Sequence, residues 1–351
     1  MFMAAATPDA IPSDPIPDWV QEWLTSRETR AEKKATTVKK APDTKAAAKR
    51  LDKKIDRINS GISSLTQFIE DLARQGLADP SIKEPETWNS MAKRMVDAQA
   101  PGLASRLRAL RDLTLRSLNW ETPFLHALGN LHLLLHTWPN RSELDPKLKA
   151  EIEQLIGLPI SKENVLATKP INDSWLVTAR SLIEQDQLQT SITWLYGIKS
   201  HRWAKTLKFG VQGQKPLEPW PLGETVQTAL HFYPGITNSR ALPANEGASA
   251  KYETPPTSTQ TFATLLHDYA TLRAQNPWHR HHPLLALLLP GENNTLIDQD
   301  GQALPCSSPL SKIILYQSLS GGHYILTCSE WDGHSLHLLS AESDAQFLNL
   351  T

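Results

Sequence analysis

The sequence predicts an α+β protein, with an N-terminal helical bundle followed by antiparallel β-rich domains. Up to about residue 160, apolar residues recur at spacings of three and four, which is typical of amphipathic helices. From about residue 170, apolar and polar residues alternate, which is typical of half-buried strands. The 351 residues are enough for two or three domains at roughly 100–200 residues each.

The helical bundle is predicted over residues 44–160. Its first helix covers about residues 44–75 and carries an apolar stripe made of Leu51, Ile55, Ile58, Ile62, Leu65, Phe68, Ile69 and Leu72. Gly76 and Pro80 indicate where that helix ends. Further helices are expected over 86–99, 103–118, 123–138 and 145–156, the last with Asp145 as N-cap and Pro146 at the first helical position. Short connections favour antiparallel packing of these helices.

Two β regions follow the bundle. An antiparallel meander domain is predicted over residues 170–245, with strands at 175–184, 188–196, 202–211 and 225–233. The third strand is expected to place Trp203, Leu207, Phe209 and Val211 on one apolar face. Residues 246–282 are interpreted as a linker and a helix over 261–276. A C-terminal β region is predicted over 283–351, with strands at 284–289, 295–297, 312–318, 323–330 and 335–340.

The N-terminal segments are the least apolar part of the chain. Residues 1–25 are predicted to be a disordered lead-in with a short helix, because prolines recur up to Pro17 and Trp19, Val20, Trp23 and Leu24 then follow at helical spacing. Residues 26–57 are predicted to be a basic linker and helix. Residues 27–57 hold 12 lysines and arginines and five acidic residues, whereas the whole chain has a net charge of −1.

This basic stretch is the first candidate for a binding function. The cations proposed to contact nucleic-acid phosphates are Lys33, Lys34, Lys39, Lys40, Lys49, Arg50, Lys53 and Lys54. Such binding would be salt-sensitive and independent of base sequence. No aromatic residue is interleaved with the cations, so base stacking is not expected. A solvated linker and helix face is the alternative interpretation.

A histidine cluster is the second candidate. His279, His281 and His282 are possible ligands for zinc or copper. In a strand, adjacent side chains point to opposite faces, so only His279 and His281 could share a metal ion there. No acidic residue or cysteine lies within five positions, and a polar loop that enters a strand is the alternative. His132 and His136 are four apart on an apolar helix with no glutamate between them, and we expect core or boundary histidines there.

Recognised catalytic motifs are missing from the sequence. It has no G-x-S-x-G, no P-loop and no G-x-G-x-x-G motif. The leading hypothesis is therefore a non-enzymatic binding protein without a cofactor, and a metal-dependent enzyme with a site assembled from dispersed residues is the alternative. The eleven tryptophans spread across all the predicted elements. Trp175, Trp194 and Trp203 fall in three neighbouring strands and are expected to pack in a sheet core, although a groove for a peptide or sugar would also explain them.

The two cysteines, Cys306 and Cys328, are too few for a disulfide scaffold or a four-cysteine zinc site. Low cysteine content fits a reducing cytosol. No apolar run approaches the roughly 20 residues that span a bilayer, and the N-terminus lacks a signal peptide. We therefore expect a cytoplasmic protein that does not bind membranes.

Four segments carry a resemblance to a known family. They are PDWVQEWLTSRETRAEKKA (17–35), WNSMAKRMVDAQAPGLASRLRAL (88–110), INDSWLVTARSLIEQDQLQTSITWLYGIKSHRWAKTLKFGV (171–211) and ALHFYPGITNSRAL (229–242). Together they resemble the bacterial SWIM-type zinc finger proteins over most of residues 17–242. In that family the zinc finger, with ligands C-x-C and C-x-H, precedes the P-D-W-V segment.

This sequence departs from the family at the finger. It has no cysteine before Cys306, so no zinc ligand is assigned, and zinc is expected only together with a finger. The chain thus resembles the region downstream of the finger, as a truncated gene product, a split protein or a finger-less paralogue. Family members often accompany a MoxR-type AAA+ ATPase and a von Willebrand factor A (VWA) protein. The resemblance therefore implies an adaptor with protein partners.

Overall fold

The computed structural model of the protein describes residues 44–115, 119–185, 188–211, 220–237, 239–251, 260–343 and 346–351. The chain divides into two compact units, residues 1–57 and residues 58–351. In the first unit, the described residues 44–57 are helical. The lead-in and short helix predicted over 1–25, and the basic stretch up to residue 43, lie outside the described residues.

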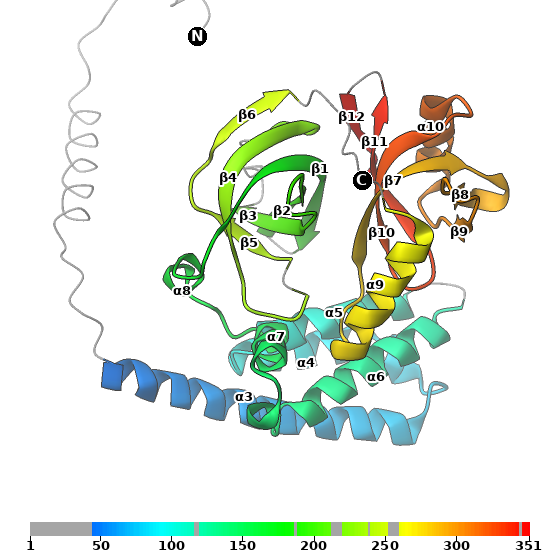
Figure 1. The fold of residues 1–351 in the computed structure, drawn as a ribbon. Helices are drawn as coiled ribbons and strands as arrows, with labels where there is room; N and C mark the ends of the chain where they lie inside the picture. The colour runs from blue at the N-terminus through cyan, green and yellow to red at the C-terminus, as the bar shows by residue number, and fades with distance from the viewer. Residues whose placement is uncertain are drawn as a thin grey trace, which may run out of the picture. The chain divides into compact units, whose positions relative to one another are not determined.

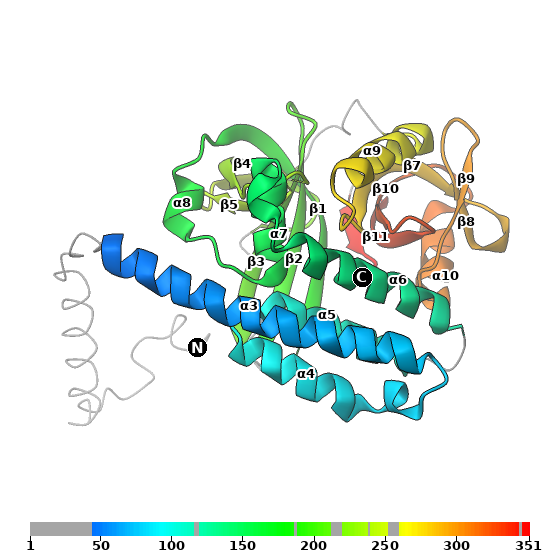
Figure 2. The same cartoon turned by 90° about the horizontal axis from the view of Figure 1, so that it is seen from below.

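The predicted helical bundle is confirmed. Its elements are α3 (Thr44–Gln75), η2 (Pro80–Lys83), α4 (Pro85–Asp97), α5 (Pro101–Thr114), α6 (Glu121–Thr137), η3 (Arg141–Glu143) and α7 (Pro146–Ile156). The short helix α8 (Lys162–Leu166) follows the bundle and contacts strand β4 (Glu224–Phe232) of the first sheet. Helices α4, α5 and α6 lie side by side (Figures 1 and 2). The second half of α3 buries Ile58, Ile62, Leu65, Ile69 and Leu72, which are spaced by three and four as the sequence predicts.

Aromatic residues anchor the bundle core. Trp88 is fully buried, meets Phe68 and Phe124 edge to face, and donates a hydrogen bond from Nε1 to the Ile82 carbonyl at 2.8 Å.

Helix α7 begins as predicted, because the Asp145 side chain accepts a hydrogen bond from the Lys147 N–H.

The first sheet contains β1 (Ile171–Gln185), β2 (Leu188–Gly197), β3 (Trp203–Val211), β4 (Glu224–Phe232), β5 (Ala241–Pro243) and β6 (Ala248–Lys251). All its paired strands are antiparallel in the order β3-β2-β1-β4-β5, and β6 also pairs with β4. The meander prediction therefore holds for β1 to β3 but not for β4, which returns to pair with β1. Strand β6 lies in the stretch that the sequence analysis treated as a linker.

Two details of this sheet position the site described below. The segment before β5 meets β3 through an isolated bridge between Lys205 and Arg240, which brings the two edges of the sheet together. The predicted face of β3 is also wrong: Ala204 and Thr206 are buried, whereas Phe209 is 58% exposed. Trp203 and Lys205 consequently point away from the inner core of this sheet.

The remaining chain forms a second antiparallel sheet with two helices (Figure 1). Its elements are α9 (Phe262–Gln275), β7 (His282–Pro290), η4 (Glu292–Asn294), β8 (Thr295–Ile297), β9 (Ala303–Pro305), α10 (Leu310–Ser320), β10 (Ile325–Trp331), β11 (Leu336–Ser343) and β12 (Gln346–Asn349). The strand order is β12-β11-β10-β7-β8-β9.

The strand predicted over 312–318 is wrong, because these residues belong to α10. Ile313 and Tyr316 are buried three residues apart, and the Tyr316 hydroxyl bonds the Leu288 carbonyl of β7 at 2.9 Å and contacts the Thr327 hydroxyl. Gly321 ends the helix in the left-handed conformation that glycine readily adopts.

The two sheets share one hydrophobic core. On one side it contains Leu176, Ala179, Trp194 and Tyr196, and on the other Leu285, Leu326, Cys328, Leu339 and Phe347. The Ser340 hydroxyl also bonds the Thr178 carbonyl across the interface. The two β regions predicted over 170–245 and 283–351 thus pack against each other within one unit. Within the described residues, no helix is both long enough and apolar enough to span a bilayer.

Candidate functional site

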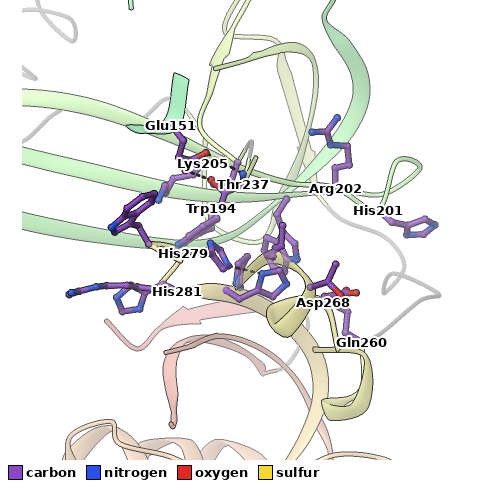
Figure 3. A pocket seen from close by; sticks show the side chains of 18 residues that line it. Glu151, Trp194, His201, Arg202, Lys205, Thr237, Gln260, Asp268, His279 and His281 are labelled. Atoms are coloured by element: carbon purple, nitrogen blue, oxygen red, sulfur yellow. Dashed lines mark hydrogen bonds between the residues drawn. The ribbon is translucent and has the colours of Figure 1, made fainter. Parts of the chain in front are cut away.

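A pocket of about 570 Å³ lies between the first sheet and the segment that joins α9 to β7. Strands β2 and β3 contribute Trp194 and Lys205, the joining segment contributes residues 278–281, and α7 contributes Glu151. Figure 3 shows side chains reaching into it from these elements. We call it the Lys205 pocket.

Lys205 is the central cation of this pocket. Burial is the main cause that lowers the pKa of its ammonium group, and Arg240 adds repulsion that Glu330 and Glu151 oppose. The ammonium nitrogen lies 5.0 Å from the centroid of the Trp194 ring, a cation–π distance. Among the ion pairs of the described residues, none includes Lys205. Its positive charge is therefore held largely out of water, and no carboxylate of the described residues pairs with it directly.

The acidic residues of the pocket do not balance its cations. Glu151 is engaged by the loop after β4: it accepts hydrogen bonds from the N–H groups of Ile236 and Thr237 and from the Thr237 hydroxyl, the last at 2.7 Å. Asp268, on α9, is exposed. Arg202 and Arg280 also line the pocket, which leaves it with a cationic interior.

The histidine cluster lies at one wall of the pocket. Nε2 of His279 lies 3.3 Å from Nδ1 of His282, whereas Nδ1 of His281 lies 3.8 Å from a carboxylate oxygen of Glu330. Burial, followed by repulsion from His282 and His281 and then from Lys205 and Arg273, lowers the pKa of His279 to about 4. Burial also lowers the pKa values of His281 and His282. His279 is therefore neutral near pH 7.

The structure corrects the predicted pairing of these histidines. A strand through these residues would place His279 and His281 on one face, but His279 contacts His282 instead, because β7 begins only at His282. The preceding segment turns at Asn276, whose carbonyl accepts the His279 N–H at 3.1 Å. Within the described ranges, no group of three or more histidine, cysteine or acidic side chains could hold a metal ion.

The family's zinc finger likewise has no counterpart in the described residues. Cys306 and Cys328 are free and buried in the second sheet region. Burial raises the pKa of the Cys328 thiol to about 12, which opposes the thiolate form that zinc requires. The residues described here therefore do not fit the finger.

The comparison with protein families concerns the helices. Residues 53–156 match the model of the SWIM-associated four-helix bundle domain. We refer to residues 53–156, which are similar to this model, as the SWIM-associated domain. The match begins within α3 and ends at Ile156, the last residue of α7, so the resemblance to SWIM-type proteins is confirmed there. No match is found among the curated proteins or the solved structures.

The predicted phosphate contacts lie at and before the start of the SWIM-associated domain. Lys33, Lys34, Lys39 and Lys40 fall outside the described residues. On α3, Lys49, Arg50 and Lys53 are exposed and Lys54 is half-buried. Asp52 and Asp56 lie among them, so this part of the helix carries charges of both signs.

Two further clusters among the described residues lack the geometry for catalysis or metal binding. In the SWIM-associated domain, the rings of His132 and His136 contact each other at 4.3 Å. Near the β10–β11 turn, Asp332 bonds His337 at 2.9 Å, and Ser307 Oγ lies 3.3 Å from each nitrogen of that ring. A hydroxyl at equal distance from both nitrogens lies along the lone pair of neither, so His337 is not placed to take the Ser307 proton.

Sequence reasoning missed Lys205, although a signal was present. Lys205 interrupts the alternating apolar series of Trp203, Leu207 and Phe209. A lone cation in such a series indicates a polar site on that face. The residues around Lys205 come from β2 and from the segment before β7. The sequence alone does not place the segment before β7 near β3.

Proposed function

We propose that this chain is a non-enzymatic adaptor that binds an acidic segment of a protein partner in the Lys205 pocket. The observation that carries the proposal is the ammonium group of Lys205, which is withdrawn from water beside Trp194 without an ion-pair partner among the described residues. An uncompensated buried charge costs free energy, and an incoming carboxylate would offset that cost.

The rest of the lining supports an acidic peptide. Arg202 and Arg280 add positive charge to the lining of the pocket, and complementary charge accelerates and orients protein association. Trp194, Trp278 and Leu272 offer apolar surface on which side chains of the partner would pack. Gln260 and Ser239 also line the pocket and offer polar groups to an extended backbone.

The resemblance to SWIM-type proteins suggests the source of this segment. We expect the partner to be an AAA+ ATPase of the MoxR type or a VWA protein, with the acidic segment on that protein. The SWIM-associated domain lies beside the pocket, since Trp278 is part of its core and donates a hydrogen bond from Nε1 to Asn130 at 2.9 Å.

A peptide titration tests the proposal. A short fluorescent peptide rich in glutamate and leucine should bind the full chain, and a peptide with lysine in place of glutamate should not. Lys205→Met should weaken binding of the acidic peptide roughly 10- to 100-fold, because a hydrogen bond to a charged group contributes about 1.5–3 kcal/mol.

Lys199→Met is the matched control. Lys199 is exposed in the β2–β3 turn and lies outside the lining of the pocket, so this variant should bind like the original chain. Equal binding of both peptides by the original chain, or equal affinities of the two variants, would refute the proposal.

A further inference from the structure

A second cleft, of about 270 Å³, lies between the SWIM-associated domain and the segment before β7. Its lining comes from one face of α5, from α6 and from the joining segment: Arg106, Ala109, Asp112, Leu113, Ala127 and Arg280. The joining segment is fixed over the helices because Trp278 is buried in the bundle core and bonds Asn130 of α6. Arg280 therefore lines the same cleft as Arg106.

Neither arginine has a carboxylate partner within the described part of the chain. Arg106 is half-buried, and burial followed by repulsion from Arg280 lowers the pKa of its guanidinium to about 10. Arg280 is more exposed, and burial followed by repulsion from Arg273 lowers its pKa as well. Among the described residues, no ion pair includes either of them.

The one acidic side chain in the cleft is already engaged. Asp112 Oδ1 accepts hydrogen bonds from Nε and Nη2 of Arg111, at 2.9 and 2.8 Å. The Arg106 and Arg280 guanidinium groups thus repel each other across a partly dry cleft. An anion between them would relieve both the repulsion and the loss of hydration.

The shape of the guanidinium group indicates the class of anion. Each guanidinium presents parallel N–H groups that match two oxygens of a phosphate, and a dianion has enough acceptor oxygens for two such groups. The cleft leaves room for a few carbon atoms against Ala109, Leu113 and Ala127. We propose that Arg106 and Arg280 form a binding site for a phosphate dianion, either free phosphate or the phosphate of a small monoester.

Calorimetric titration of the full chain with inorganic phosphate at pH 8 tests this site, with sodium chloride at equal ionic strength as the reference. We expect saturable binding of phosphate to the original chain. Arg106→Gln and Arg280→Gln should each weaken it roughly tenfold or more, as expected for loss of a charge-assisted hydrogen bond. Arg94→Gln, an exposed arginine on α4, is the matched control and should leave the affinity unchanged.

A parallel titration with glycerol phosphate distinguishes the two sources, since tighter binding than that of inorganic phosphate indicates a monoester and weaker binding indicates free phosphate. The absence of saturable binding to the original chain would overturn the proposal, and so would equal affinities of Arg280→Gln and Arg94→Gln. Arg280 is exposed, so this second comparison holds even if Arg106→Gln fails to fold.

Thermal unfolding without phosphate separates binding from a structural role. If the role of Arg106 is to bind an anion, Arg106→Gln should be at least as stable as Arg94→Gln, because the substitution removes a desolvated charge. A clear loss of stability in Arg106→Gln alone would indicate a structural role and count against the site. This proposal does not depend on the acidic-peptide function: Lys205→Met should leave phosphate binding unchanged, and Arg106→Gln should leave peptide binding unchanged.

Discussion

His279 gives the molecule a measurable dependence of stability on pH. Its imidazole is half-buried in the Lys205 pocket, where burial, the neighbouring histidines, Lys205 and Arg273 lower its pKa to about 4. In the unfolded chain a histidine has a pKa of about 6.5. Between these two values the unfolded chain binds more protons than the folded chain, so the free energy of unfolding falls as the pH falls.

The size of the effect follows from the two pKa values. A difference of one pKa unit corresponds to about 1.36 kcal/mol, so the full loss is about 3 kcal/mol and is complete below pH 4. About 2 kcal/mol of it appears between pH 7.5 and pH 5.0. Replacing His279 with phenylalanine keeps an aromatic ring beside Tyr269, whose ring lies 5.8 Å away, and removes the titrating group.

Urea unfolding followed by tryptophan fluorescence, at pH 7.5 and at pH 5.0, measures this difference. The variant loses the contact between His279 and His282, so its stability at pH 7.5 should fall by about 1 kcal/mol. The free energy of unfolding of the variant, however, should decrease between pH 7.5 and pH 5.0 by about 2 kcal/mol less than that of the original chain. His267→Phe, at an exposed position on α9, is the control and should not alter the decrease. If His279→Phe and the original chain lose equal stability on acidification, the argument from burial is wrong.

Three further outcomes are expected. Gly157→Ala should destabilise the chain by about 2 kcal/mol or more in urea unfolding, because Gly157 has a φ of 111° and an added Cβ would lie 2.8 Å from the Gly102 backbone nitrogen. Gly129→Ala is the contrasting substitution. Gly129 lies inside α6 with open space around it, so alanine there should stabilise the chain by about 0.5–1 kcal/mol. If the basic N-terminal stretch binds nucleic acid, a salt titration should show reduced affinity when alanine replaces Lys33, Lys34, Lys39 and Lys40, and unchanged affinity would remove that hypothesis. Elemental analysis of the dialysed chain should find no stoichiometric zinc if the adaptor proposal is correct, whereas one zinc per chain would favour the metal-dependent enzyme.

Much of the fold follows from local patterns in the sequence. Helix α3 covers Thr44–Gln75 as its apolar stripe predicts, and Asp145 caps α7 as its position before a proline predicts. Helix α10 was mistaken for a strand because Ile313, Ile314 and Leu315 form an apolar run without a clear period. Whether such a run becomes a helix depends on what its faces meet, and the Tyr316 contact with β7 is not visible in the sequence.

The Lys205 pocket shows a second limit of sequence reasoning. His279 and His282 are in contact because a turn at Asn276 precedes β7. If a strand begins one residue earlier or later, different side chains share a face of the sheet. Lys205 meets the histidine wall only because β3 and the segment before β7 lie in the same unit. Contacts of this kind join residues more than seventy positions apart and depend on the packing of whole elements.

The core shared by the two sheets affects how this protein can be dissected. Leu285, Leu326 and Leu339 cover Leu176 and Trp194, so a break anywhere between β6 and α9 would leave both fragments with bare apolar surface. Neither fragment alone is therefore a useful reagent for mapping partners. When the two fragments are produced together, they should reassociate through this surface. Partner binding could then be switched on by adding the second fragment to the first.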